Sequence, residues 1–316
     1  MTEASPATSS TSPAAGFQGK RLLFTGPTSQ VGEPIAKALA AGNEVFGVAR
    51  FSNPKARARL EEAGVTCITC DLTSDDFTDL PDDIDYVVNF AVTHGTDWDA
   101  DIEANCVSPG RLMYRYESAL AFLHCSSTAV YEHAGPAPRK ETDPLGDNHR
   151  GFMETYSIVK IAAEVVARTM ARTLGLPTTI ARLNVPYGNS GGWPLIHLDM
   201  MRGGMRIDLH PERPNVFTLL HEDDMVRMLP GLLAAASVPA TVVNWGGEDV
   251  VSIEEWCGFL TELTGIEAEF GENPAMIGSV VPDLTKMREL VGPATIAWRD
   301  GVRRMVQARR PDLLRA

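Results

Sequence analysis

The residues with the clearest chemical potential are a tyrosine and a lysine four positions apart, Tyr156 and Lys160. Positions i and i+4 lie on one face of a helix, so within a helix both side chains point the same way. A neighbouring cation lowers the pKa of a tyrosine, which is ordinarily about 10. Such a tyrosine can give a proton to a carbonyl oxygen, or take one from an alcohol, while hydride moves at the carbon. The pair therefore indicates oxidation or reduction of a carbonyl or secondary alcohol.

Three hydroxyl side chains precede this pair by about 30 residues: Ser126, Ser127 and Thr128. They follow directly on an apolar run, 122–125, that we predict to be a strand. Ligands of parallel sheets bind at the carboxyl ends of the strands, so these hydroxyls are expected to face the cleft. One of them can then donate a hydrogen bond to the reacting oxygen.

A glycine-containing turn lies between a predicted strand, 21–25, and a predicted helix, 31–41. Its sequence, TGPTSQVG at 25–32, stands where a pyrophosphate meets the positive end of a helix. The usual dinucleotide fingerprint has three glycines, and here Ser29 takes the middle position. The turn predicts a dinucleotide site, with a plain strand-to-helix turn as the alternative.

The residues at the end of the second predicted strand, 44–49, indicate whether NAD or NADP binds. An acidic residue there accepts from the ribose 2′-hydroxyl of NAD, whereas an arginine accommodates a 2′-phosphate. This chain has no acidic residue at the end of that strand, and Arg50 follows it directly. We therefore favour NADP(H), with NAD(H) possible; the alternatives for Arg50 are a solvated side chain or one stacked on the adenine.

The elements that must position these residues alternate between strands and helices, which is typical of crossover units in a parallel sheet. We predict an α/β fold, a Rossmann-type doubly wound parallel sheet with a smaller C-terminal substrate-binding cap. Besides those already given, strands are predicted at 65–70, 86–91, 177–183 and 241–244, and helices at 55–63, 102–120, 153–174, 252–264 and 299–308. The helix at 252–264 carries a capping box, with Ser252 as N-cap and Glu255 three residues on.

The predicted domain organisation divides the chain into four parts. Residues 1–17, rich in Ser, Thr, Ala and Pro, are expected to form a disordered leader. The dinucleotide-binding domain is predicted to span 18–185, with 218–248 returning to it. The cap is predicted to comprise 186–217, which reads as loop-rich, and 249–316.

Composition restricts the partners. With 41 acidic and 28 basic residues the net charge is −13 and no basic block occurs, which argues against nucleic acid. No apolar run is long enough to span a membrane. Five cysteines do not form a disulfide framework, and we expect a cytoplasmic protein. Cys67 and Cys70 form a CxxC, but on a strand residues three apart face opposite ways, so no metal site is expected.

An ordered series of motifs resembles the extended short-chain dehydrogenase/reductase family, often called the NAD-dependent epimerase/dehydratase family. The resemblance covers roughly residues 20–305. Its motifs are TGPTSQVG at 25–32, DL at 71–72, NFA at 89–91, NCVSPG at 105–110, SSTAVY at 126–131, YSIVK at 156–160, RLNVPYG at 182–188, HEDD at 221–224 and NWGG at 244–247.

The resemblance implies roles for individual residues. Tyr156 would be the catalytic acid/base, Lys160 would hold the nicotinamide ribose, and Ser127 would bind the carbonyl. Asp71 would reach the adenine, and Asn105 would stabilise the helix before the fifth strand. Helices 102–120 and 153–174 would form a homodimer interface.

The expected cofactor site, beyond Lys160, consists of Gly26, Thr28, Ser29, Gln30, Val31, Arg50, Asp71, Leu72, Phe90, Ala91, Val92, Leu183 and Val185. The expected substrate site consists of Thr93, His94, Thr128, Asn184, Tyr187, Trp193 and Phe217.

Departures from the family narrow the reaction. Ala129 stands where dehydratases carry an acid and where deoxysugar reductase-epimerases carry a cysteine, so neither chemistry is expected. Phe217 occupies the position at which sugar-nucleotide epimerases commonly carry a diphosphate-binding arginine. We therefore expect an NADP(H)-dependent oxidoreductase acting on a non-nucleotide, neutral or apolar small molecule. The alternatives are an NAD-dependent sugar-nucleotide epimerase and, more remotely, a non-catalytic dinucleotide-sensing regulator.

Overall fold

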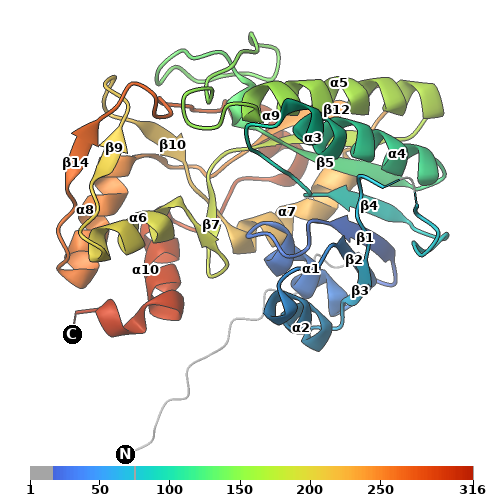
Figure 1. The fold of residues 1–316 in the computed structure, drawn as a ribbon, viewed down its shortest axis with the longest axis horizontal. Coiled ribbons are helices and arrows are strands. Elements are labelled where there is room, and N and C mark those ends of the chain that lie inside the picture. Colours follow the sequence, from blue (N-terminus) through green and yellow to red (C-terminus); the bar gives the residue numbers. More distant parts are fainter. Residues whose placement is uncertain (1–16, 75, 316) are drawn as a thin grey trace, which may run out of the picture.

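In the computed structural model, which describes residues 17–74 and 76–315, seven parallel strands form one sheet with helices on both faces (Figure 1). The strand order is β12-β6-β5-β4-β1-β2-β3. This confirms the Rossmann-type sheet, and all but the last residue of the predicted leader lie outside the described residues. The strands are β1 (Arg21–Thr25), β2 (Glu44–Ala49), β3 (Thr66–Thr69), β4 (Tyr86–Asn89), β5 (Ala121–Ser127), β6 (Thr178–Leu183) and β12 (Thr241–Trp245).

The sheet is buried on both faces, which explains why its strands are almost uniformly apolar. Successive residues of β1 belong to different cores: Leu22 and Phe24 pack with one set of helices and Leu23 with the other. The first set is α1 (Gly32–Ala40), α2 (Pro54–Glu62), α7 (Glu222–Ala234) and α9 (Thr285–Val291). The second is α4 (Ser108–Arg115) and α5 (Tyr156–Leu174).

The strand order reverses between β1 and β4, so a crevice opens at their carboxyl ends. Buried side chains bridge the strand ends there. The Thr25 hydroxyl donates to Asn89 Oδ1 at 2.5 Å, and Asn89 Nδ2 donates to Nδ1 of His124 on β5 at 3.1 Å. Burial, together with the positive charge of Lys160, lowers the pKa of His124 to about 3, so this histidine is neutral. The floor of the crevice is thus rigid and uncharged.

The helix α5, which carries Tyr156 and Lys160, is anchored by a buried ion pair. Glu164 accepts from Arg182 of β6 at 2.7 and 2.8 Å and from the hydroxyl of Ser126 on β5 at 2.7 Å. Glu164 and Arg182 are each 1% exposed. Burial acts to raise the pKa of Glu164, but hydrogen bonds and charge from Arg182 outweigh it and hold the pKa below its usual range.

A second apolar core lies beside the sheet, where Figure 1 shows the smaller elements gathered at one side. Its centre is formed by Leu198, Trp256, Leu260 and Met305. The elements on this side are β7 (Pro186–Gly188), β8 (Gly191–Gly192), α6 (Trp193–Arg202), β9 (Ile207–Leu209), β10 (Val216–Thr218), β11 (Leu220–His221), β13 (Val250–Ser252), α8 (Ile253–Thr264), β14 (Phe270–Glu272) and α10 (Trp298–Arg309). The predicted capping box is present at α8, where Ser252 and Glu255 exchange hydrogen bonds.

The observed elements differ from the predicted ones at several places. The helix predicted at 102–120 is α3 (Trp98–Ile102), a π-helical turn (Glu103–Val107) and α4; it starts early because Asp97 caps it, and it ends at Arg115. The loop-rich segment contains α6. The helices α7 and α9 were not predicted; α7 contains Pro230, which the structure accommodates inside the helix.

We predict that Glu164→Gln lowers the free energy of unfolding by about 3–5 kcal/mol, because it leaves the buried Arg182 uncompensated. The stabilisation should be present above the ordinary glutamate pKa and be lost as the pH falls through the lower pKa of the folded state. Urea titrations at pH 7 would measure the loss. The exposed pair Arg57–Glu61 is the control, since Glu61→Gln should leave stability nearly unchanged; equal effects would contradict the prediction.

Candidate active site

A cavity of about 780 Å³ lies at the carboxyl edge of the sheet and continues into the second core. The turn before α1, the ends of β4, β5 and β6, and the first turn of α5 form one side. The other side is formed by α6, β9, α8 and residues 276–280. The cavity thus joins the two halves of the chain.

The turn after β1 is built to let a ligand approach the backbone closely. Gly26 has φ +65°, and a Cβ there would lie 2.8 Å from the backbone nitrogen of Ala91. The Ser29 hydroxyl donates to the carbonyl of Gly26 at 2.8 Å and accepts from the backbone N–H of Gly32 at 2.9 Å. Ser29, at the middle-glycine position, has no positive φ, so its backbone conformation does not itself require a glycine. The turn and the following helix fit a pyrophosphate, and the crevice fits a nicotinamide dinucleotide.

The charges at the end of β2 lie where an adenosine ribose would be read. The backbone N–H and hydroxyl of Thr73 lower the pKa of the Asp71 carboxyl, and the charge of Arg50 lowers it further. Arg50 therefore lies close enough to Asp71 to act on it electrostatically. The Phe51 backbone is left-handed (φ 48°), and the Arg57 guanidinium lies 5.3 Å from its ring centroid.

Tyr156, Lys160 and Ser127 converge on the cavity. Lys160 Nζ donates to the carbonyl of Cys125 at 2.9 Å and lies 5.9 Å from the Tyr156 ring centroid. The Ser127 oxygen accepts from the backbone N–H of Ala129 at 3.1 Å, which leaves its proton for another acceptor. Ser126 instead donates to Glu164. The structure thus distinguishes the two serines, as only Ser127 has a proton available for a ligand.

Two histidines flank Tyr156. The His149 ring centroid lies 5.7 Å from that of Tyr156, and the exposed His94 ring lies 6.3 Å away, edge-on. Burial lowers the pKa of His149 to about 4, so it is neutral at pH 7. Sequence reasoning identified His94 but not His149.

The far wall of the cavity is aromatic. Ring contacts run from Phe152 through Trp193, His197 and Trp256 to Phe217, with centroid distances of 5.6–6.2 Å. The indole N–H of Trp256 donates to Nδ1 of His197 at 2.9 Å, and burial lowers the pKa of this histidine to about 4.

Polar groups occur where this wall meets β9. Arg206 and Asp208 line the cavity there and pair with each other at 2.8 Å. Arg206 and Lys160 are the arginine and lysine side chains that line the cavity in the described part of the chain.

Most residues that the sequence predicted for the site line the cavity. Those on the wall are Ser29, Gln30, Val31, Phe90, Val92, His94, Ser127, Thr128, Tyr156, Lys160, Leu183, Asn184, Val185, Trp193 and Phe217. Gly26, Thr28, Arg50, Asp71, Leu72 and Ala91 lie outside this lining; Gly26 abuts Ala91, and Leu72 packs on the apolar core.

Two residues expected at the substrate point elsewhere. The Thr93 hydroxyl donates to Asp101 at 2.8 Å, and its backbone is held by Asn105. The Tyr187 hydroxyl donates to the carbonyl of Trp298, and its ring meets His221 edge-on. Both are therefore occupied in packing, because strand-end residues alternate in direction.

Asn184 lines the cavity but acts as a cross-link. It donates to Thr128 Oγ1 at 2.7 Å and to the Val280 carbonyl at 3.1 Å, and it accepts from the Thr218 N–H at 2.9 Å. Its polar atoms join the end of β6 to β10 and to Val280, so few hydrogen-bonding positions remain for a ligand.

The lining residues that sequence reasoning missed come mainly from the cap and from the loop before α5. They include His149, Phe152, His197, Arg206, Asn215, Trp256 and Met276. No motif or period marks them; the clustering of tryptophan and histidine around α6 and α8 was the available signal.

Neither a metal site nor a membrane span is evident in residues 17–74 and 76–315. Cys67 and Cys70 direct their sulfurs to different backbone carbonyls, those of Arg57 and Asp76. No group of three or more His, Cys, Asp or Glu gathers as metal ligands would, and no helix of this part is long and apolar enough to cross a bilayer.

Comparison with known proteins identifies a matching family and a relative of similar length. The model of the "NAD dependent epimerase/dehydratase family" matches residues 22–245. An "Uncharacterized 37.6 kDa protein in cld 5′region" of Escherichia coli O111:H- is 25% identical, over 90% of this chain and 97% of that protein.

Solved structures share the fold. MoeE5 in complex with UDP-glucose and NAD superposes with a TM-score of 0.78 at 23% identity, covering 93% of this chain and 99% of that one. UDP-glucuronic acid 4-epimerase from Bacillus cereus, with UDP-glucuronic acid and NAD, gives 0.79 at 18% identity, with coverages of 91% and 98%. DesIV, a dTDP-glucose 4,6-dehydratase from Streptomyces venezuelae with NAD and TYD bound, gives 0.79 at 22%, with 92% and 97%.

We predict that Gly26→Ala weakens dinucleotide binding at least about tenfold, because its Cβ would meet the backbone of Phe90 and Ala91 at 2.8 Å. Fluorescence titration with NADH and NADPH would measure the loss. Gly135→Ala is the matched control: Gly135 also has a positive φ (59°), with nothing within 4 Å of an added Cβ. It should carry the same conformational cost of about 1 kcal/mol and bind normally. Equal binding by the two variants would exclude the turn from the cofactor site.

Proposed function

Since this chain belongs to the NAD-dependent epimerase/dehydratase family, we propose that it is a dinucleotide-dependent enzyme in which Tyr156 moves a proton at a substrate oxygen. The observation that carries the proposal is the convergence of Tyr156, Lys160 and Ser127 on one cavity beside the glycine turn. A non-catalytic sensor would not need this set.

The roles follow from the contacts. A nicotinamide dinucleotide, when bound, supplies the hydride donor or acceptor. Ser127 donates its free proton to the reacting oxygen and orients it. Tyr156 takes the hydroxyl proton from the substrate in the oxidising direction and returns it in the reducing direction. Lys160, fixed by its hydrogen bond to the Cys125 carbonyl, lies beside the phenol, with Nζ 5.9 Å from the centre of the Tyr156 ring.

For the substrate we propose a sugar nucleotide, and for the reaction a reversible oxidation such as epimerisation. The solved structures of this fold are named for UDP- and dTDP-sugars, which supports this alternative over the non-nucleotide substrate expected from the sequence. That expectation rested on the missing arginine at position 217. Arg206 on the cavity wall offers a guanidinium for a diphosphate from a different element.

A second candidate is the reduction of a neutral, non-nucleotide carbonyl compound. The observation that favours it is the aromatic wall from Phe152 to Phe217, which provides more apolar than charged surface for a ligand. Arg206, in this case, would serve only its pair with Asp208.

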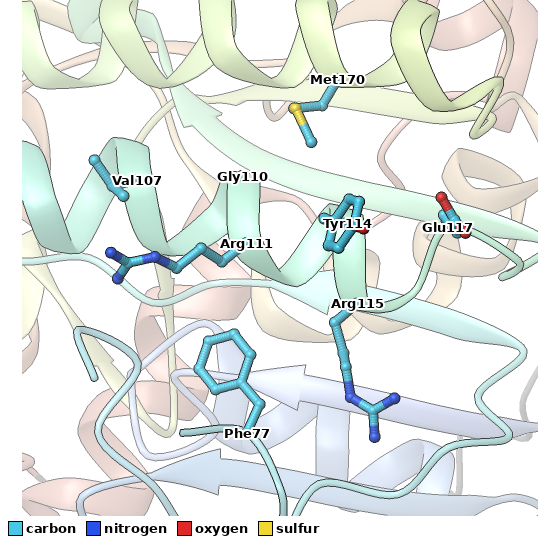
Figure 2. Close-up of a pocket in the computed structure, with 8 residues that line it drawn as sticks. All are labelled: Phe77, Val107, Gly110, Arg111, Tyr114, Arg115, Glu117 and Met170. Atoms are coloured by element: carbon cyan, nitrogen blue, oxygen red, sulfur yellow. The ribbon is translucent and has the colours of Figure 1, made fainter. Parts of the chain in front are cut away.

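We further propose a homodimer through α4 and α5. A depression of about 760 Å³ is lined by Gly110 and Tyr114 of α4, by Val107 of the preceding π-helical turn, and by Phe77 and Met170 (Figure 2). Tyr114 is 69% exposed and Val165 of α5 is 58% exposed, so both helices present apolar side chains at the surface. A solution mass equal to one chain of 34.2 kDa would contradict the dimer.

We predict that Tyr156→Phe lowers kcat about 10²- to 10⁴-fold while the dinucleotide Kd is unchanged, because only the proton-transfer group is removed. The assay is epimer interconversion of UDP- and dTDP-hexoses, followed by NMR. Wild-type enzyme that retains NAD through purification and interconverts epimers supports the sugar-nucleotide reaction. Net NADPH consumption with carbonyl compounds, and none with sugar nucleotides, would favour the second candidate. Full activity of Tyr156→Phe would contradict both.

The second candidate includes a preference for NADP(H), supported by Arg50 and the absence of an acid at the end of β2. Arg50→Ala should then weaken NADPH binding about ten- to a hundredfold, since a charge-assisted contact to the 2′-phosphate is lost. NADH affinity, measured in the same titration, is the internal control and should stay constant. An equal loss for both dinucleotides would show that Arg50 contacts the adenine or the pyrophosphate instead.

A further inference from the structure

His149 is held in one tautomer by a chain of two hydrogen bonds. The side-chain Nδ2 of Asn148 donates to the backbone carbonyl of Tyr131 at 2.8 Å. A carbonyl can only accept, so this contact fixes the orientation of the Asn148 amide. The Oδ1 of Asn148 then faces Nδ1 of His149, and because Oδ1 also only accepts, Nδ1 must carry the proton.

The remaining ring nitrogen, Nε2, is consequently an acceptor. Burial keeps the imidazole neutral at pH 7, with a pKa lowered to about 4. The charged neighbours in the chain, Asp147 and Arg150, pair with each other at 3.3 Å, so neither offers His149 a countercharge. The ring of Tyr156, on α5, lies 5.7 Å from that of His149, centre to centre. Nε2 has no partner among the described residues.

The position of His149 relative to Tyr156 is also fixed. Its backbone N–H donates to Ser157 Oγ at 3.3 Å, and its carbonyl accepts from the N–H groups of Phe152 and Met153 at 2.9 and 2.7 Å. His149 is thus tied to the first turn of α5 and lines the same cavity as Tyr156. His94, on the other side of Tyr156, is exposed and makes no such contacts.

We propose that His149 is a substrate-binding residue whose Nε2 accepts a hydrogen bond from a substrate hydroxyl next to the reacting carbon. An unprotonated nitrogen there selects a donor, so the site takes a vicinal diol, as in a sugar, rather than an isolated carbonyl. The inference rests on the proposed function in that Tyr156 acts at the adjacent oxygen.

The tautomer can be read without any substrate. Long-range proton–nitrogen spectra of ¹⁵N-histidine-labelled protein at pH 7 should show Nδ1 protonated and Nε2 unprotonated for His149. His149→Phe identifies the signals by deleting them, and His94→Phe, the matched control, should leave them in place. Asn148→Leu removes the lock and should give a mixture of tautomers. A protonated Nε2 in the wild type, as the reverse tautomer or as imidazolium, would overturn the proposal.

Binding is then tested with UDP-glucose in the presence of NAD. The Nε2 signal should move upfield, as for a nitrogen that accepts a hydrogen bond, while Nδ1 stays constant. His149→Phe should weaken UDP-glucose about three- to tenfold without altering NAD affinity. UDP-glucose that binds and leaves Nε2 unmoved overturns the role of His149. UDP-glucose that does not bind the wild type counts against the sugar-nucleotide substrate, and the tautomer spectrum still decides for or against His149.

Discussion

The buried pair of Glu164 and Arg182 is the constraint on which the geometry of the site depends. Glu164 lies one turn beyond Lys160 on α5, and Arg182 lies in β6, between β5 and β12. Arg182 also stacks over Tyr131, whose hydroxyl donates to Asn244 of β12 at 2.5 Å. The helix, three strands and the loop after β5 are therefore linked through one guanidinium. A buried charge pair tolerates little displacement, since separation leaves two uncompensated ions.

This anchoring determines where the reactive groups meet. With α5 fixed against β5, Lys160 reaches the carbonyl of Cys125 and Tyr156 lies opposite the end of the same strand. Ser126 is engaged by Glu164, so the next residue, Ser127, turns its hydroxyl toward the cavity. The same loop that stacks on Arg182 through Tyr131 also orients Asn148 and hence His149. The structural pair and the candidate substrate contacts thus share one network.

The cap supplies the wall of the cavity that lies opposite the sheet. Asn184 ties the β6 end to the returning strand β10 and to the Val280 segment, and so positions the aromatic wall opposite Tyr156. That wall gives the cavity an apolar surface, and Arg206 with Asp208 adds one ion pair to the lining. The aromatic wall and Arg206 are therefore the residues on which the two proposed substrate classes differ.

What the sequence determined by itself was local. Short apolar runs, glycine turns and the four-residue spacing of Tyr156 and Lys160 depend on backbone geometry over a few residues, so the sheet, α5 and the glycine turn were predictable. The helix α7 was not predictable in this way, because tertiary packing outweighs the unfavourable effect of Pro230 on helix formation. The directions of Thr93 and Tyr187, and the arrival of His149, Trp256 and Arg206 at the cavity, were decided only by the tertiary structure. These contacts join residues far apart in the chain, and no local pattern encodes which distant side chain will satisfy a buried polar group or complete a packed wall.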